Sequence, residues 1–317
     1  MQNTKMTKYA TKTINKVSYT FIAEEIDDAL NETIDEVTTK KQLILTRKTS
    51  KDSVIVEQPL QITLSWLEQG KVKRKVFTIT MRTPGHDYLL IMGLLHSEGV
   101  IKQLKDVETI KSESGEVTGE GKYNEWLIKF TNGFIPDLSS LDRYMVSYSS
   151  CGLCGTTSLK TLQLKTDINL SYPEHKNILM AQSILLLSSK MRNEQDLFDQ
   201  TGGVHGAALF DQQLNIQQLY EDIGRHNAVD KVIGALLALD KSLQKAPLWI
   251  LLVSGRISFE IVQKTIMAGI SILVGVGAPS DLAIQAAKQF DLTLIGFTSN
   301  KGFNVYHGDW RLTNETK

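Results

Sequence analysis

The spacing of apolar residues divides the chain into a strand-rich first part and a second part in which strands and helices alternate. Between residues 53 and 82, apolar and polar positions alternate with a period of two, which predicts half-buried strands, with a turn at 68–70. Residues 86–98 carry apolar side chains at helical spacing, so a helix is predicted there. A second strand pair is predicted at 107–111 and 125–130.

The second part of the chain predicts a mixed sheet covered by helices. Helices are predicted over 178–195, 226–238, 258–268 and 280–290, and strands over 206–210, 217–220, 248–254, 270–276, 293–297 and 303–306. Ser280 is placed to cap the last of these helices. Strands that alternate with helices in this way favour a single sheet with helices on both faces.

The first 50 residues differ from the rest because they are polar and charged. The acidic stretch 21–36 has apolar residues at roughly helical spacing, so at most a marginal helix or a poorly ordered extension is expected. The predicted organisation is an extension, a smaller strand-rich domain with one helix, a core domain and a short tail, at residues 1–50, 51–140, 141–312 and 313–317.

Composition excludes several protein classes. Lys plus Arg and Asp plus Glu number 35 each, so net charge points to neither a nucleic-acid nor a membrane partner. No apolar run approaches the roughly 18–20 residues of a membrane-spanning helix. The polar N-terminus lacks a secretory signal, and two cysteines make no disulfide framework. A cytoplasmic protein is expected.

The candidate chemistry lies in the segment 147–156, which contains both cysteines of the chain, Cys151 and Cys154. Glycines follow each cysteine and allow sharp turns, and neighbouring hydroxyl groups can stabilise a thiolate, the reactive form of cysteine. One interpretation is a persulfide carrier, in which one cysteine holds a sulfur atom and the other assists its release.

Three other interpretations of the cysteine pair remain open at this point. The C-x-x-C spacing occurs in dithiol redox sites, although no thioredoxin-like context surrounds it. A zinc site would need His205 and His226 as further ligands, at a spacing that matches no common zinc module. The cysteines could also be buried and inert. Spacing alone does not select among these.

Other polar clusters follow predicted strands. His205 comes after a Gly-Gly turn, Arg225 opens a predicted helix, and Ser254-Gly255-Arg256 joins a strand to a helix, as does the segment 275–280. Loops at the carboxyl ends of such strands often bind ligands, and helix N-termini bind anions. A nucleotide or pterin phosphate site is therefore predicted. The structural alternatives are a core histidine and a capped helix with surface ion pairs.

Taken together, these motifs resemble the formate dehydrogenase accessory sulfurtransferase family (FdhD). The motifs that carry the resemblance occur in the same order and are Arg82-Thr83-Pro84-Gly85, Ser97-Glu98-Gly99-Val100-Ile101, Cys151-Gly152-Leu153-Cys154-Gly155, Thr201-Gly202-Gly203-Val204-His205, Asp222 to Lys231 and Ser254-Gly255-Arg256. The resemblance covers roughly residues 53–312 and leaves the first part of the chain unmatched.

The resemblance implies an α/β fold, with a cytidine-deaminase-like three-layer core and a smaller strand-rich N-terminal domain. It implies a sulfurtransferase that takes persulfide sulfur from a cysteine desulfurase on Cys151, with Cys154 and His205 assisting. The acceptor would be the molybdenum bis(molybdopterin guanine dinucleotide) cofactor, which formate dehydrogenase requires. A homodimer is expected, and zinc is not. A cofactor-binding chaperone without sulfur transfer and a dithiol oxidoreductase are the alternatives.

By the same resemblance, the cofactor would contact the stretch Phe297-Thr298-Ser299-Asn300-Lys301-Gly302. The family often carries arginines where this chain has Ser299 and Gly302, so other cations are expected to supply charge. Those cations are Arg225, Arg256 and Lys264, and Ser254 and Gly255 are expected in the same site. Deaminase activity is not expected, because no Glu follows His205 in the H-x-E pattern of zinc deaminases.

Overall fold

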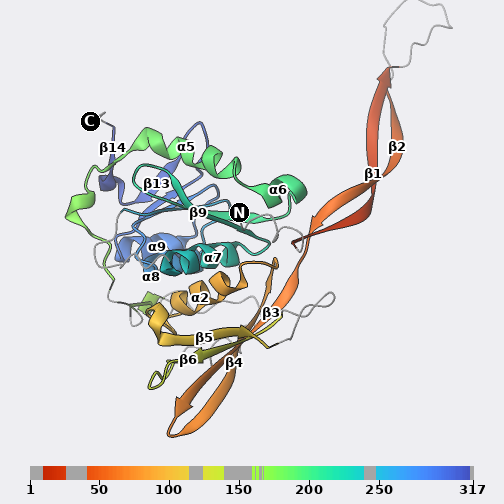
Figure 1. The fold of residues 1–317 in the computed structure, drawn as a ribbon. Coiled ribbons are helices and arrows are strands. Elements are labelled where there is room, and N and C mark those ends of the chain that lie inside the picture. Colours follow the sequence, from red (N-terminus) through yellow and green to blue (C-terminus); the bar gives the residue numbers. More distant parts are fainter. Residues whose placement is uncertain are drawn as a thin grey trace, which may run out of the picture.

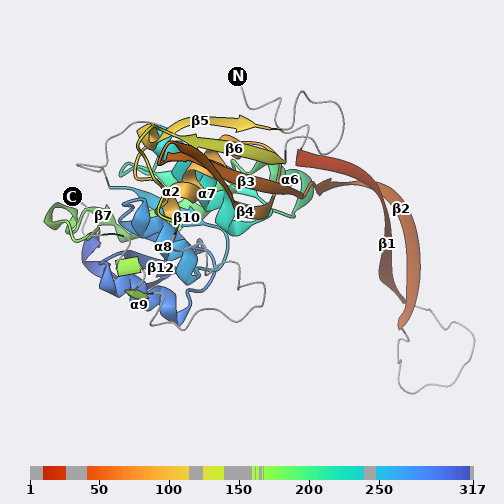
Figure 2. The same ribbon diagram turned by 90° about the horizontal axis from the view of Figure 1, so that it is seen from below.

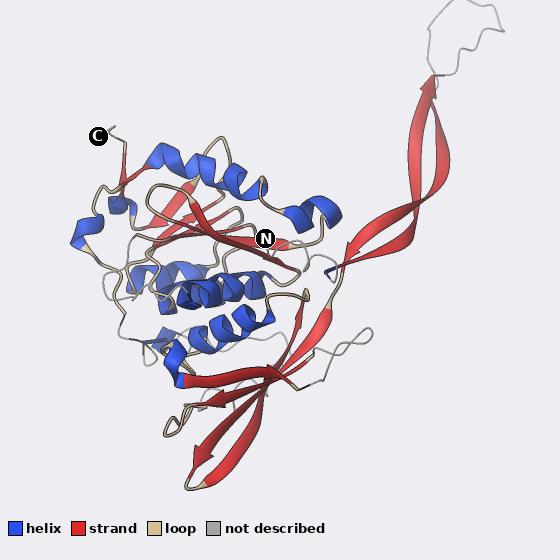
Figure 3. Cartoon of the chain, in the orientation of Figure 1, coloured by secondary structure: helices blue, strands red, loops and turns tan. Residues whose placement is uncertain are grey.

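The computed structural model describes residues 10–25, 41–113, 124–138, 159–160, 162–163, 166, 168–238 and 248–314. The two larger sheets that these residues form, one of six strands and one of four, have helices between them (Figures 1 and 3). From one side to the other, the layers are a helical layer, a six-stranded sheet, three helices, one further helix and a four-stranded sheet. The mixed α/β class predicted from the pattern is confirmed.

The six-stranded sheet positions the candidate site. Its strands are β8 (His205–Phe210), β9 (Ile216–Asp222), β10 (Ile250–Val253), β11 (Ile272–Gly275), β12 (Thr293–Gly296) and β13 (Asn304–His307). They lie in the order β13-β12-β11-β10-β8-β9. The three central strands β10, β11 and β12 are parallel, and the outer strands are antiparallel to their neighbours. The turns after the parallel strands therefore meet at one edge of the sheet.

Both faces of this sheet are buried, as its continuous runs of Ile, Leu and Val require. One face packs on α7 (Arg225–Ala238), α8 (Phe259–Met267) and α9 (Asp281–Gln289), and the other packs on α5 (Ala181–Arg192). Nearby lie α6 (Asp196–Thr201), the short strands β7 (Leu179–Met180) and β14 (Leu312–Thr313), and the 3-10 helices η3 (Pro173–His175) and η5 (Asp309–Arg311). The expected three-layer core is confirmed.

The smaller sheet has a core of its own. Its strands are β3 (Gln58–Glu68), β4 (Lys71–Arg82), β5 (Val107–Ser112) and β6 (Glu125–Phe130), in the order β4-β3-β6-β5. Leu60, Ile62 and Leu64 of β3 are fully buried under α2 (Asp87–Ser97), and η2 (Leu104–Asp106) precedes β5. The predicted turn between β3 and β4 and the predicted helix are confirmed, while the exact domain boundaries stay a prediction.

The two sheets meet through α2 and α7, which cross at two glycines. A Cβ added to Gly93 would lie 1.8 Å from the backbone oxygen of Asp230, and one added to Gly234 would lie 2.0 Å from that of Leu89. No side chain fits at either position. The absence of side chains lets the two helix backbones touch, and this contact fixes the smaller sheet against the larger one.

The expectation for the N-terminal segment is wrong for the residues that the structure describes. β1 (Thr11–Glu25) and β2 (Lys41–Ile55) form a long antiparallel ribbon that projects away from the body (Figures 1 and 2). Residues 21–25, part of the expected helix, belong to this ribbon, and 26–36 lie outside the described residues. The strand pattern was not visible in the sequence, because polar Lys and Thr residues obscured the alternation of apolar and polar positions.

The remaining helix predictions agree with the structure within a few residues at each end. Ser280 caps α9 as predicted, since its hydroxyl accepts a hydrogen bond from the Ala283 backbone N–H at 3.3 Å. Within the described residues, every helix is too short or too polar to cross a bilayer.

Candidate functional site

Three consecutive turns at the carboxyl edge of the large sheet form the floor of the candidate site. Gly277 after β11 donates to the Gly255 oxygen after β10 at 3.1 Å, and Phe297 after β12 donates to the Gly277 oxygen at 3.2 Å. A Cβ on Gly277 would lie 2.9 Å from the Arg256 backbone, so only glycine allows these turns to approach. The sequence predicted the Gly-bearing turns, and the parallel strands bring them together.

His205 and Arg225 flank the first of these turns. A Cβ added at Gly255 would lie 3.4 Å from His205 Nδ1 and 3.7 Å from Arg225 Cδ. Ser254 fixes the neighbouring strand, because its hydroxyl accepts from the Gly206 N–H at 3.0 Å. Burial and then the Arg225 charge lower the pKa of His205 below its usual value. The histidine is therefore neutral near pH 7 and able to accept a proton.

Two buried polar atoms near these turns have no hydrogen-bond partner among the described residues: Arg225 Nε and Thr298 Oγ1. Thr298 is almost completely buried, and leaving such a group unsatisfied costs about 1–3 kcal/mol. Beside it, the Phe297 side chain is 52% exposed and its backbone adopts a left-handed conformation with φ 54°. Strained backbone and orphaned polar groups of this kind are typical of ligand sites.

The rest of the expected cofactor stretch forms a tight exposed turn. Ser299 donates its N–H to the Gly302 oxygen at 2.9 Å, and Lys301 donates its N–H to the Ser299 hydroxyl at 3.2 Å. Lys301 and Arg256 are both exposed, as is Asn300. The structure therefore gathers Arg225, Arg256 and the 297–302 turn along one edge, and it supplies cations next to backbone turns that suit a phosphate.

The sequence did not show that His226 belongs to a polar cluster beside this edge of the sheet. His226 Nε2 lies 3.2 Å from the Ser258 hydroxyl, which also hydrogen-bonds the Glu260 carboxylate. Burial, followed by the charges of Lys264 and Arg225, lowers the pKa of His226 to about 4. The signal in the sequence was the Arg-His-Asn run at a helix start, but the partner Ser258 is 32 residues away.

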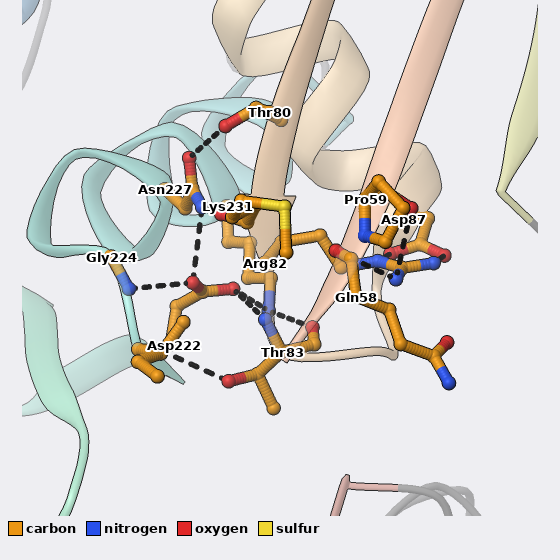
Figure 4. A network of polar contacts seen from close by, with 12 residues as sticks. Gln58, Pro59, Thr80, Arg82, Thr83, Asp87, Asp222, Gly224, Asn227 and Lys231 are labelled. Carbon is orange, nitrogen blue, oxygen red and sulfur yellow. Dashed lines mark hydrogen bonds and ion pairs between the residues drawn. The ribbon is translucent and has the colours of Figure 1, made fainter. Parts of the chain in front are cut away.

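Much of the Asp222 to Lys231 motif is structural, not ligand-binding (Figure 4). Asp222 and Lys231 are both buried and form an ion pair at 2.7 Å. The Asp222 carboxylate also accepts from the backbone N–H groups of Thr83 and Gly224, at 3.2 and 2.8 Å. Asn227 donates to the Met81 oxygen at 2.7 Å. The expected surface ion pairs are in fact a buried network that joins α7 to the end of β4.

Arg82, from the first motif of the resemblance, is structural as well. Its guanidinium is 1% exposed and binds both carboxylate oxygens of Asp87, at 2.9 and 3.0 Å (Figure 4). It also donates to the backbone oxygen of Gln58 at 3.3 Å. The motif therefore fixes the turn between β4 and α2.

Lys264 cannot supply charge to a phosphate, so that expectation is wrong. Its ammonium is buried and binds both carboxylate oxygens of Asp230, at 2.8 and 2.9 Å. Burial raises the pKa of Asp230 to about 6, although the Lys264 charge acts in the opposite direction. Ser97 donates to the same carboxylate at 3.1 Å. The sequence could not separate this buried cation from the exposed Arg256.

Cys151 and Cys154 lie outside the described residues, so their distance from His205 stays a prediction. The flanking described residues are anchored in different cores. Leu138 packs against the core of the smaller sheet, and Leu159 packs against the core under α7 and α8. Among the described residues, no group of His, Cys, Asp and Glu is arranged to hold a metal ion.

Comparisons with known proteins identify relatives over most of the chain. The profile of the FdhD/NarQ family matches residues 55–313. A protein of Streptomyces coelicolor named sulfur carrier protein FdhD is 40% identical over 280 residues, which cover 86% of this chain and 94% of that protein. A protein of the same name from Saccharolobus solfataricus is 41% identical over 256 residues, covering 80% of this chain and 89% of the relative.

A solved structure shares the fold. It is a crystal structure of a formate dehydrogenase accessory protein from Desulfotalea psychrophila, and it superposes with a TM-score of 0.60 at 21% identity. The superposition covers 92% of this chain and 99% of the other.

Proposed function

The chain belongs to the FdhD/NarQ family, and we propose that it is a sulfur carrier that serves the maturation of formate dehydrogenase. The observation that carries the proposal is that the matched residues 55–313 contain both cysteines of the chain. Relatives that match this chain at about 40% identity bear the name sulfur carrier protein. The proposed cellular location is the cytoplasm, where thiols remain reduced.

Sulfur is loaded onto Cys151. The Cys151 thiolate attacks the terminal sulfur of a persulfide held by a cysteine desulfurase, as in thiol–disulfide exchange. The sulfur–sulfur bond of the donor breaks, the donor cysteine leaves as a thiolate, and a persulfide forms on Cys151. No net oxidation or reduction occurs, because one persulfide replaces another.

Release uses the second cysteine. The Cys154 thiolate attacks Cys151 Sγ, the bond between that sulfur and the carried sulfur breaks, and a disulfide links the two cysteines. The carried atom leaves as sulfide, so the two thiols supply its two electrons. A cellular dithiol reductant then restores the pair. This chemistry explains why two cysteines would stand three positions apart, whereas a simple carrier needs one.

The acceptor is proposed to be the molybdenum cofactor with its two guanine dinucleotide arms, bound as substrate at the strand-end turns. Arg225 and Arg256 would bind phosphate, and the exposed Phe297 ring would stack on a guanine. Arg225 Nε and Thr298 Oγ1, which have no partner in the described part of the chain, would gain hydrogen bonds to such a ligand. Neutral His205 would take up or release the proton that accompanies sulfur transfer.

The first experiment tests sulfur loading. The protein is incubated with a cysteine desulfurase and cysteine, alkylated and analysed by peptide mass spectrometry. We expect one added sulfur atom on Cys151, lost in Cys151→Ser and retained in Cys154→Ser, which cannot release it. Robust desulfurase turnover without an adduct would refute the carrier. Maturation of formate dehydrogenase by Cys151→Ser would instead support a cofactor-binding chaperone.

The second experiment tests the acceptor site with GDP as the probe. Titration calorimetry on Arg225→Ala and Phe297→Ala is expected to show GDP binding weakened by at least about tenfold. That is the loss expected from removing one charge-assisted hydrogen bond or one stacking contact. Lys288→Ala, an exposed cation on α9, is the matched control and should bind as the wild type does. Equal affinity in all variants would remove the strand-end turns as the nucleotide site.

A further inference from the structure

A second cavity lies away from the strand-end turns and follows β9, so it is called the edge groove below. It has a volume of about 600 Å³ and is bounded by residues 216–221 of β9, by the turn 83–86 before α2 and by residues at the start of α6. Ala10, the residue before the β1–β2 ribbon, also lines it.

The strand that lines the edge groove has a free edge. In the described part of the chain, β9 is the last strand of its sheet and has β8 as its one strand neighbour. Gly206 of β8 lies opposite Glu221, yet its N–H and its oxygen both bond to Ser254. The N–H of Glu221 therefore points away from β8, and so does that of Leu219, two residues earlier. These two N–H groups, called the groove amides below, are oriented to pair with a further strand.

The rim of the edge groove is acidic. Glu194 and Asp196 line it and are both exposed. Glu221 is engaged already, because its carboxylate accepts from two backbone N–H groups of α6 at 2.7 and 2.9 Å. Lys231 also lines the groove, but it pairs with Asp222 at 2.7 Å. The groove therefore offers two exposed carboxylates to a cationic ligand.

The chain itself enters the described part of the molecule at this groove. Ala10 is 2% exposed, and its backbone oxygen accepts from the Val56 N–H at 2.7 Å, so its position is fixed at the base of the ribbon. Residues 1–9 lie outside the described residues. Because successive Cα atoms are about 3.8 Å apart, the segment that precedes Ala10 begins at the wall of the groove.

The sequence of residues 1–9 complements the groove. The segment reads Met-Gln-Asn-Thr-Lys-Met-Thr-Lys-Tyr, with Lys5 and Lys8 as its charged side chains and no acidic residue. Threonine and tyrosine favour strands, and neither proline nor glycine interrupts the segment. Nine residues in a strand span about 30 Å at roughly 3.3 Å per residue, and the seven residues of β9 span about 23 Å. The segment is therefore long enough to follow β9 from end to end.

The base of the ribbon sets the direction in which the segment can run. A Cβ added to Gly203 would lie 3.6 Å from Ile55 Cγ2, so the ribbon's base lies beside the residues that precede β8. His205, the first residue of β8, pairs with Asp222, the last residue of β9. The segment before Ala10 thus starts near the end of β9 and leads toward its beginning. Read in chain order, it runs parallel to β9.

We propose that residues 1–9 bind in the edge groove of their own chain as a strand parallel to β9, with Lys5 and Lys8 paired to Glu194 and Asp196. The segment fills the free edge of the large sheet, where an open strand invites association with other chains. It also holds the base of the ribbon against the body. The segment precedes residue 55, where the family match begins, and this contact is independent of the proposed sulfur transfer.

A disulfide between the segment and β9 tests the contact directly. In a Cys151→Ser/Cys154→Ser background, Met6→Cys is combined with Gln218→Cys and oxidised mildly at low protein concentration. We expect a disulfide within one chain, identified by peptide mass spectrometry of the monomer. Met6→Cys with Lys288→Cys on α9, which packs at the β12–β13 end of the sheet, is the control and should form little of it. Equal yields in the two variants, no disulfide with Gln218→Cys, or a disulfide that joins two chains would each overturn the proposal.

Hydrogen exchange tests the same contact without added cysteines. Lys5→Glu/Lys8→Glu brings like charges to the acidic rim, so at low salt the groove amides should exchange at least about tenfold faster than in wild type. Lys176→Glu/Lys288→Glu, at exposed positions away from the groove, makes the same change in net charge and should leave their exchange unchanged. Groove amides that exchange at one rate in wild type and in Lys5→Glu/Lys8→Glu, or that respond equally to both pairs of substitutions, would refute the docking.

Discussion

Arg225, His226 and Asn227 are consecutive in the chain, yet each has a different environment. Arg225 flanks the Gly255 turn, His226 contacts the Ser258 hydroxyl, and Asn227 donates to the Met81 oxygen. Successive helical residues point about 100° apart, so the first turn of α7 serves three neighbours at once. One motif therefore contributes both to the candidate site and to the contact between the two sheets.

The low pKa of His226 predicts an acid-sensitive fold. Its pKa falls from 6.5 to about 4 on folding, because of burial and the nearby Lys264 and Arg225, while Glu260 opposes the shift and His205 adds to it. The unfolded chain therefore binds a proton that the folded chain does not. The free energy of unfolding is expected to fall as pH drops from about 6.5 to 4, by about 2–3 kcal/mol from this residue.

The His226→Gln variant isolates that contribution. Urea denaturation at pH 7 and pH 4.5 is expected to show a smaller loss of stability at low pH than in wild type. The neutral side chain keeps a hydrogen-bonding group near Ser258 without a titrating ring. An unchanged pH slope would mean that the folded histidine titrates near its usual pKa.

Loss of one partner of the Asp222–Lys231 pair should be severe. Asp222→Ala leaves the Lys231 ammonium, which is 1% exposed, without its counter-charge and removes the acceptor for the Thr83 N–H. The expected cost is about 3–5 kcal/mol. Asp52→Ala, which breaks the exposed pair with Lys16, should cost less than about 1 kcal/mol. Urea titration of both variants measures the difference, and equal costs would contradict it.

At the scale of elements, the α2–α7 crossing decides how the sheets are joined. Gly→Ala in a helix normally stabilises it by about 1 kcal/mol, because alanine has the better helix propensity. At Gly234 the added Cβ would lie 2.0 Å from the Leu89 oxygen, so the helices must separate. Gly234→Ala is therefore expected to lower the free energy of unfolding by about 2 kcal/mol or more, against its propensity.

Gly203→Ala is the control for this substitution. The atom nearest to its added Cβ would be Ile55 Cγ2, at an ordinary 3.6 Å, followed by the Thr201 backbone oxygen at 3.9 Å. Its effect on the denaturation midpoint should be small. A Gly234→Ala variant as stable as wild type would show that the helices have room that the structure does not give them.

At the scale of the molecule, the cores of the smaller and the larger sheet unfold together only if the contact between α2 and α7 stays intact. The four tryptophans report on them separately, with Trp66 and Trp126 in the smaller sheet and Trp249 and Trp310 in or near the larger one. One variant carries Trp66→Phe and Trp126→Phe, and a second carries Trp249→Phe and Trp310→Phe. Each variant therefore keeps the tryptophan pair of one core. The two fluorescence transitions in urea are expected to coincide, as in one cooperative unit.

Adding Gly234→Ala to both backgrounds should separate the two transitions. The helix contact and the Asp222 network both link the two sheets, and widening the crossing weakens both. Transitions that remain superimposed would indicate that other contacts, among or beyond the described residues, carry the cooperativity.

The sequence by itself determined most of the strands and helices outside the β1–β2 ribbon and α6, and it selected candidate residues whose chemistry stays a prediction. Periods of two and 3.6 predicted both sheets' strands and the helices of the core, because hydrophobic burial imposes those periods on any sequence. The motifs also indicated the family and the strand-end turns. The ribbon was missed because a strand pair that projects from the body need not bury an apolar face, and so leaves little period to detect.

Only the tertiary structure decided which polar residues are available to a ligand. Lys264, Arg82 and Lys231 resemble Arg225 and Arg256 in sequence, but the first three are buried against carboxylates. Their partners are separated from them by as few as five and as many as 34 residues. Whether a charge is paired depends on how the helices and strands pack, and the spacing of residues along the chain does not decide it.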